Sequence, residues 1–218
     1  MARVTDRHGR PTGGQMPGLV EGLVVDNVDP EGMGRVKVKF PSLPESTESY
    51  WCRLSMPMAG GKRGWMTIPE KDDEVLVSFV HGDVQHAIVV GSLYNGVDKP
   101  PYANEDKENN LRVFQSRSGH RVTFDDTKGS ERIEIITNNE EIRIIFDAEQ
   151  KTLAVYSGKD IVIEAKEKIS LKCKDFVLEA TEKISTNSTQ TTEVTSGTDC
   201  TIDGGQQLTL TAQSVNIN

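Results

Sequence analysis

Short runs of alternating apolar and polar residues fill the first part of the chain and predict β-strands rather than helices. Leu19–Val25 is rich in β-branched residues and leads into a turn at residues 29–34, Asp-Pro-Glu-Gly-Met-Gly. In residues 35–40 the alternation is strict, so Val36, Val38 and Phe40 share one face of a strand and the cations share the other. Further strands are expected at Tyr50–Ser55, Trp65–Ile68, Glu74–His81 and His86–Leu93.

Five or six short strands between residues 17 and 94, with no helical period, predict a small closed barrel such as an OB-fold. An OB-fold raises the possibility of nucleic-acid binding, which needs aromatic residues interleaved with cations along one groove. Here acidic residues are spread around Trp51, Trp65 and the Lys62-Arg63 pair. We therefore expect the two tryptophans to be core or packing residues and nucleic acid not to be a partner.

A second pattern begins near Leu153, where pairs of residues two apart recur every seven or eight positions. Residues two apart on a strand point to the same side, so each repeat sends one pair inward. Two positions after each of the first eight pairs stands a small residue, where the chain is expected to turn a corner. The pairs are Leu153/Val155, Ile161/Ile163, Ile169/Leu171, Phe176/Leu178, Ile184/Thr186, Thr192/Val194, Cys200/Ile202, Leu208/Leu210 and Val215/Ile217, and the small residues are Ser157, Ala165, Cys173, Ala180, Ser188, Ser196, Gly204 and Ala212.

A repeat this regular is typical of solenoid-type architectures. Nine repeats stacked at sheet spacing would rise about 43 Å as a thin rod. One chain supplies only two inward side chains per strand and leaves its sheet edges open, whereas three chains wound about one axis would close every face. We therefore expect an intertwined trimeric β-helix, or β-prism, in preference to a monomeric β-solenoid. Its trimer core would consist of all the paired residues except Thr186 and Thr192, which are β-branched but polar.

The expected fold class is all-β, an N-terminal OB-fold barrel followed by this octad-repeat β-prism. We expect residues 1–16 to form a polar, flexible arm and residues 17–94 to form the barrel. Residues 95–110, rich in Pro and Asn, are expected to form a linker, and residues 111–218 the β-prism, with continuous short strands from Leu111 onward.

Composition narrows the range of functions. The chain carries 33 Asp and Glu against 25 Lys and Arg, a net charge of −8, which argues against a phosphate-binding surface. No apolar run approaches the roughly 18 residues that span a bilayer, and the N-terminus has no hydrophobic signal segment. We expect synthesis in the cytoplasm.

Candidate metal ligands are few. Cys52, Cys173 and Cys200 are odd in number and far apart, which predicts reduced thiols rather than a disulfide framework or a zinc site. His81 and His86 flank a Gly-Asp turn and would face each other across a hairpin, but no third ligand is evident. The sequence therefore predicts no metal and no cofactor.

Candidate catalytic residues are equally scarce. Asp125 and Asp126 are adjacent, so on a strand they would point to opposite faces, and Gly129 close behind them indicates a turn. A hydrolase would need paired carboxylates in a cleft. We expect no catalytic residues. The alternative function is a polysaccharide-degrading or receptor-binding trimeric tailspike. The first of these would need a wide solenoid with acidic grooves, and the octads are too narrow for one.

Several motifs in one order resemble the spike proteins of contractile injection systems, that is, the VgrG spikes of type VI secretion, phage baseplate spikes and extracellular injection systems. The resemblance covers residues 16–218. It rests on Met16–Gly22, Asp29–Val38, Gly64-Trp65 followed by Ile68-Pro69, Asp73–Val77, His81-Gly82-Asp83, Val90–Gly96, Ser118-Gly119-His120 and Phe124–Gly129.

The resemblance implies a homotrimeric spike at the centre of a baseplate, which caps the inner tube, leads it through a target envelope and contacts the target membrane transiently. Its partners would be baseplate hub and inner tube proteins and a small PAAR-type tip protein. Some phage spikes end instead in an iron-binding His-x-His motif, but no histidine follows His120 here, which favours a separate tip protein. The tip protein is expected to dock at Val215, Asn216, Ile217 and Asn218.

Full-length VgrG proteins carry a large hub region before the barrel, and the first sixteen residues are too short to supply one. The chain is expected to be either a short spike whose hub is a separate protein, which Met1 and the polar arm favour, or a trimmed form. A separate hub favours assembly into a phage tail-like or extracellular particle over a type VI-like apparatus.

Overall fold

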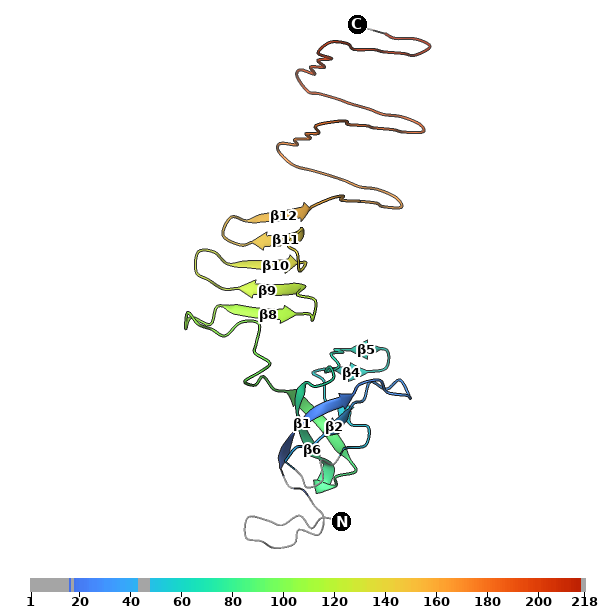
Figure 1. Ribbon diagram of the computed structural model, residues 1–218. Coiled ribbons are helices and arrows are strands. Elements are labelled where there is room, and N and C mark those ends of the chain that lie inside the picture. Colours follow the sequence, from blue (N-terminus) through green and yellow to red (C-terminus); the bar gives the residue numbers. More distant parts are fainter. Residues whose placement is uncertain (1–15, 17, 43–47, 217–218) are drawn as a thin grey trace. The chain divides into compact units, whose positions relative to one another are not determined.

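The structure is a computed structural model that describes residue 16, residues 18–42 and residues 48–216 (Figure 1). The expected arm lies outside the described residues except for Met16, and so do Ile217 and Asn218. The secondary structure of the described residues is β apart from one 3-10 turn, Val80–Gly82, so the predicted all-β class is confirmed. In this part of the chain no helix has the length and apolar character needed to cross a membrane. The chain divides into two compact units, Met1–Ile161 and Val162–Asn218.

The first sheet is a five-stranded barrel with strand order β2-β1-β6-β7-β3. Its pairs are antiparallel except for β3 and β7, which run parallel. Two hydrogen bonds between Val36 and Cys52, N–O distances 3.0 and 2.7 Å, connect the outer strands and close the barrel. The strands are β1 Leu19–Asp26, β2 Lys37–Lys39, β3 Arg53–Leu54, β6 Glu74–Phe79 and β7 Ala87–Ser92.

The barrel core is small and mostly aliphatic. Val36, Val38 and Phe40 are all buried, which confirms the shared face predicted from their alternation. The rings of Phe40 and Phe79 lie 5.6 Å apart between centroids. Strand β1 passes so close to β2 at Gly22 that a Cβ there would lie 2.3 Å from Cγ1 of Val38, so only glycine fits. Met16 is also buried, and its N–H donates to the carbonyl of Gly82 at 2.8 Å, so it belongs to this core.

The strand predicted at Trp65–Ile68 is wrong. The structure has instead a short hairpin just before it, β4 Ala59–Gly60 and β5 Arg63–Gly64, which turns at Lys62 with φ 57°. Gly64 has φ 152°, and a Cβ there would lie 2.7 Å from the carbonyl oxygen of Met58. The hairpin ends at the hydrogen bond from Trp65 N–H to that carbonyl, 2.9 Å, and the residues that follow have no ladder partner. Trp65 is consequently exposed and is not a core residue.

A second sheet of five antiparallel strands forms a simple meander, β12-β11-β10-β9-β8 (Figure 1). It confirms the short strands predicted from Leu111 onward as far as Ser157. The strands are β8 Leu111–Gln115, β9 Arg121–Asp125, β10 Arg132–Ile136, β11 Ile142–Asp147 and β12 Thr152–Ser157. Asp125 is the last residue of β9, and its carboxylate accepts from the N–H of Thr127 at 3.0 Å, so the turn predicted at this point is confirmed.

The second unit consists of successive passes of extended chain without strand assignments (Figure 1). Bends recur at 166, 174, 181, 189, 197, 205 and 213, each one residue after a small residue of the repeat. At two corners a serine hydroxyl donates to an aspartate carbonyl three residues on, Ser157 to Asp160 at 2.9 Å and Ser196 to Asp199 at 2.7 Å. The seven-to-eight-residue period of the sequence is therefore present in the backbone.

Candidate assembly face

One face of the second sheet is built from two apolar rows that cross its five strands. Directly paired residues in antiparallel strands share a face, so the register defines each row. The first row runs Leu153, Phe146, Ile133 and Phe124 and ends at Arg112, and the second runs Val155, Ile144, Ile135, Val122 and Phe114. We call these nine apolar residues, together with Ile142, the apolar face.

Most of the apolar face is open to solvent in the single chain. Leu153 is 62% exposed, and the phenylalanines Phe114, Phe124 and Phe146 are each about half exposed. Monomeric soluble proteins rarely expose a contiguous apolar patch of more than a few hundred Å². An antiparallel sheet with one apolar and one polar face normally packs the apolar face on a core. The apolar face is therefore a candidate surface for association.

The opposite face of the same sheet combines charged side chains with apolar ones such as Ile136, which is buried, and Ile145. The buried Nε of Arg143 on this face has no hydrogen-bond partner among the described residues. Arg132 lies 3.0 Å from Glu134 and 3.5 Å from Asp125, and the Arg143 guanidinium lies 4.7 Å from the centre of the Tyr156 ring. Hydrogen bonding by Thr127 and the charge of Arg132 hold the pKa of the Asp125 carboxyl below its ordinary value. Charged side chains are therefore concentrated on this face of the sheet.

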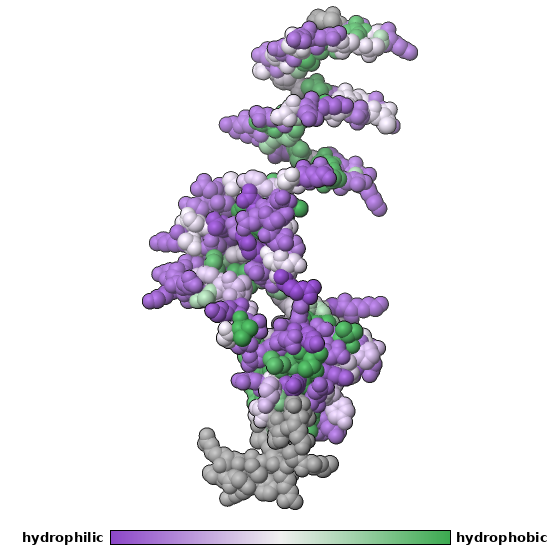
Figure 2. Space-filling model, in the orientation of Figure 1, coloured by the Kyte–Doolittle hydropathy of each residue, from purple (hydrophilic) through white to green (hydrophobic). Residues whose placement is uncertain are grey.

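The residues predicted to form the trimer core fall into two groups. Leu153 and Val155 lie on the apolar face, opposite Phe146 and Ile144. The others that the structure describes lie from residue 161 onward, and Figure 2 shows green apolar side chains on the surface of the second unit among purple polar ones. All of this second group are exposed in the single chain: Ile161, Ile163, Ile169, Leu171, Phe176, Leu178, Ile184, Val194, Cys200, Ile202, Leu208, Leu210 and Val215.

The exposure of this second group differs from the buried core that the octad repeat predicts. A core side chain would be almost fully buried. Five members of the group are instead 59–80% exposed: Leu171, Leu178, Val194, Ile202 and Leu210. The physical reason is that one extended chain places no second surface opposite its inward pairs. Within the described part of the single chain these residues form no buried core, and a core between chains stays a prediction.

The residues predicted to dock a tip protein lie at the end of the same unit. Val215 and Asn216 are exposed, while Ile217 and Asn218 lie outside the described residues. Docking of a tip protein at this end therefore also stays a prediction.

The backbone of the second unit is almost without hydrogen-bond partners. Among the described residues from 162 to 216, a single backbone N–H donates to a backbone carbonyl, that of Gln207 to Gly204 at 3.0 Å. In a folded protein nearly all backbone donors and acceptors are paired or solvated, and long extended segments pair with neighbouring strands. The second unit therefore lacks both a ladder partner and a core as a single chain.

The apolar residues of β8 to β11 were not among those predicted from the sequence. The signal was present, because Val122/Phe124, Ile133/Ile135 and Ile144/Phe146 are pairs two apart like those of the octads. Their spacing is eleven residues, since the connecting turns are longer, and it shortens to nine at Leu153/Val155. A search for inward pairs at any spacing would have found them.

The geometry supports association with another surface. Apolar rows and extended backbone without partners together provide a surface that another strand-rich surface of the same kind can cover. His86, which the sequence placed across a hairpin from His81, instead pairs with Asp83, Nδ1 to Oδ2 at 2.8 Å, and both histidines are exposed.

Comparison with known proteins agrees with this fold. Residues 20–94 match the family model described as the type VI secretion system/phage-baseplate injector OB domain. The chain is 33% identical over 128 residues to the type VI secretion system spike protein VgrG3 of Vibrio cholerae. The aligned region covers 55% of this chain and 13% of that protein. The chain is 31% identical over 134 residues to the spike protein VgrG1a of Pseudomonas aeruginosa, covering 56% of this chain and 21% of that protein.

A third relative is named as a toxin. The actin cross-linking toxin VgrG1 of Vibrio cholerae is 32% identical over 126 residues, covering 51% of this chain and 12% of that protein. The chain thus matches only about a tenth to a fifth of the length of these curated relatives. Fold and match together define an all-β protein built on an injector OB domain. The chain therefore contains an injector OB domain and is similar over about half of its length to VgrG spike proteins.

Proposed function

We propose that the chain is the central spike of a contractile injection machine and works as a rigid homotrimer. The spike role is supported by the injector OB domain and by the similarity to VgrG spike proteins. The trimer is supported chiefly by one observation, the long extended second unit whose backbone and apolar pairs have no partner within the described chain.

Three chains meet this requirement in a single arrangement. Each chain would supply strands whose N–H and C=O groups pair with those of its neighbours, and each repeat would send its pair toward a common axis. The apolar face of the second sheet would be covered in the same assembly. The proposed trimer core comprises the paired residues from Leu153/Val155 to Val215/Ile217, including Cys200 and without Thr186 and Thr192.

In this proposal the role is mechanical. Force along the axis would be shared by every interchain hydrogen bond and apolar layer, which suits a part that caps the inner tube and punctures an envelope. The proposed partners are baseplate hub and inner tube proteins, and a PAAR-type protein that docks at Val215–Asn218. The chain would be made in the cytoplasm and assembled into the baseplate of the particle.

Light scattering and native mass spectrometry of the full chain test the trimer, and a stable monomer would refute it. A pull-down with a PAAR-type protein tests the tip. Val215→Asp should lose capture, because it puts a charge into the terminal apolar layer, while Ser214→Asp, one residue away on the other side of the strand, should keep it. Both variants should retain the trimer mass, and undiminished capture by Val215→Asp would refute this docking site.

A further inference from the structure

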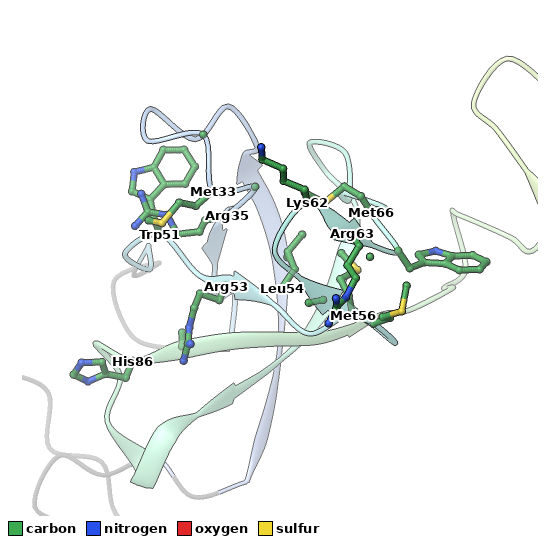
Figure 3. Close-up of a pocket in the computed structure, with 18 of the residues that line it drawn as sticks. Met33, Arg35, Trp51, Arg53, Leu54, Met56, Lys62, Arg63, Met66 and His86 are labelled. Carbon is green, nitrogen blue, oxygen red and sulfur yellow. The ribbon is translucent and has the colours of Figure 1, made fainter.

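The OB barrel carries a groove that the spike role does not use. It has a volume of about 990 Å³ and lies beside the β4–β5 hairpin. Figure 3 shows Met33, Arg35 and Trp51 on one side of it, Lys62, Arg63, Met56 and Met66 on the other, and Arg53 and Leu54 between them. We call it the methionine groove, because four methionines, Met33, Met56, Met58 and Met66, line it.

The charge of the methionine groove opposes that of the chain. Four cations line it, and none of its described lining residues is Asp or Glu, although acids outnumber bases by 33 to 25 in the sequence. Arg35 is held by Asp29 at 2.8 Å and Glu31 at 3.0 Å. Among the described residues, no carboxylate oxygen lies within 4.0 Å of a side-chain nitrogen of Arg53, Lys62 or Arg63. Three cations are thus available to a ligand.

The apolar lining is open but held on a well-fixed frame. Met33, Met58 and Met66 are each more than half exposed. The loop that presents Met33 is fastened by the Asp29 carboxylate, which accepts from the N–H groups of Glu31, Met33 and Arg35 at 3.0, 3.0 and 3.2 Å. Flexible thioether side chains on a fixed backbone adapt to apolar side chains of varied shape, as at protein surfaces that bind several peptides.

The aromatic side chains do not favour nucleic acid. The Trp51 ring already has the Lys37 ammonium 5.1 Å and the Arg35 guanidinium 6.0 Å from its centroid. Trp65 meets the Phe114 ring at an interplanar angle of 86° and a centroid distance of 6.3 Å. Binding of a single strand depends on successive bases stacking on free aromatic faces. The groove instead offers cations beside thioethers, which suits carboxylates beside aliphatic side chains.

We propose that the methionine groove binds an acidic peptide segment of another protein, with carboxylates on Arg53, Lys62 and Arg63 and an apolar side chain among the methionines. This function goes beyond puncturing and is independent of how the tip is capped.

The test is an array of short fluorescent peptides that combine Glu or Asp with Leu, Phe or Met, titrated against the full chain. Matched peptides with Lys in place of the acids, and oligo-dT, serve as competing probes. We expect the acidic peptides to bind with an affinity that falls as salt is added. The variant Lys62→Glu/Arg63→Glu should weaken binding about tenfold or more, since two attractive contacts become repulsive. The control Lys128→Glu/Lys151→Glu, two exposed turn lysines outside the groove, should bind like the wild type.

Three results would overturn the proposal. The first is that no acidic peptide binds, or that the groove variant binds as well as the control. The second is tighter binding of oligo-dT than of every peptide, which would assign the groove to nucleic acid. The third is a change of mass in light scattering for Lys62→Glu/Arg63→Glu alone, which would mean that a second copy of the chain occupies the groove. A trimer that fails to form in all samples would refute the spike proposal instead.

Discussion

Replacing Leu153 by Asn separates the requirements of the single chain from those of the assembly. Leu153 lies on the apolar face in β12, and it is 62% exposed in the single chain. Its neighbour Thr152 is also exposed and points to the opposite side of the same strand. In a lone chain, therefore, Leu153→Asn and Thr152→Asn should both change stability little. In the proposed trimer only Leu153→Asn places an amide in a closed apolar layer.

The expected size of the effect follows from the exposed fraction. Full burial of a leucine side chain is worth about 1.5–3 kcal/mol, so covering the 62% that is still exposed contributes about 1.4 kcal/mol per chain. Three chains then lose about 4 kcal/mol, which corresponds to roughly a thousandfold in the association constant. Three buried amides without hydrogen-bond partners would add to this loss.

Light scattering over a dilution series is the assay, with the midpoint of dissociation as the readout. The wild type and Thr152→Asn should dissociate at the same concentration, and Leu153→Asn should dissociate at a much higher one. If Leu153→Asn keeps the wild-type midpoint, the apolar face does not lie inside an assembly. If Leu153→Asn and Thr152→Asn dissociate at the same raised concentration, the loss of the trimer comes from a change to the strand and not to the apolar face, and the reasoning also fails.

Two further predictions concern the repeat and the barrel. Ile163→Asp should abolish the trimer and lower its melting temperature severely, whereas Val162→Asp, between the members of the same pair and 84% exposed, should behave like the wild type. A wild-type melting temperature for Ile163→Asp would mean that the inward assignment is wrong. In the barrel, the Arg35 guanidinium holds the pKa of Asp29 well below its ordinary value of 3.8, so this carboxylate stabilises the fold above that pH and progressively less below it. Asp29→Asn should therefore lower the melting temperature at neutral pH, and the gap from the wild type should narrow in acid. Equal melting temperatures at neutral pH would contradict this role.

The barrel could be predicted from sequence where the alternation was strict and failed where glycine set the geometry. Val36, Val38 and Phe40 are buried as their spacing predicts. The strand at Trp65–Ile68 was predicted from its apolar content, but the turn at Lys62 and the close approach at Gly64 end the pairing first. Local composition carries no information about such a backbone contact, because it depends on which segment lies opposite.

The same distinction applies to the methionine groove. Trp51, Trp65, Lys62 and Arg63 were visible in the sequence, but they stood among acidic residues. Folding turns those acids away and brings Arg53 and the methionines to the same side. Charges on the surface act on one another over about 8 Å in physiological salt, so only residues that are neighbours in space set the local charge. Proximity in sequence was therefore a poor guide to the charge of the groove.

The octad pairs and their small corner residues were recognised from the sequence alone, because a strand alternates its side chains with period two whatever it packs against. Their direction toward a core between chains stays a prediction. The bends after each small residue recur every seven or eight residues, as the pairs do. Only the tertiary structure decided that the apolar rows begin earlier, at Phe114 and Phe124, because the register of five strands brings together residues with unequal spacing. It also established that most of these rows stay exposed within the described chain, since coverage depends on which surfaces meet in space.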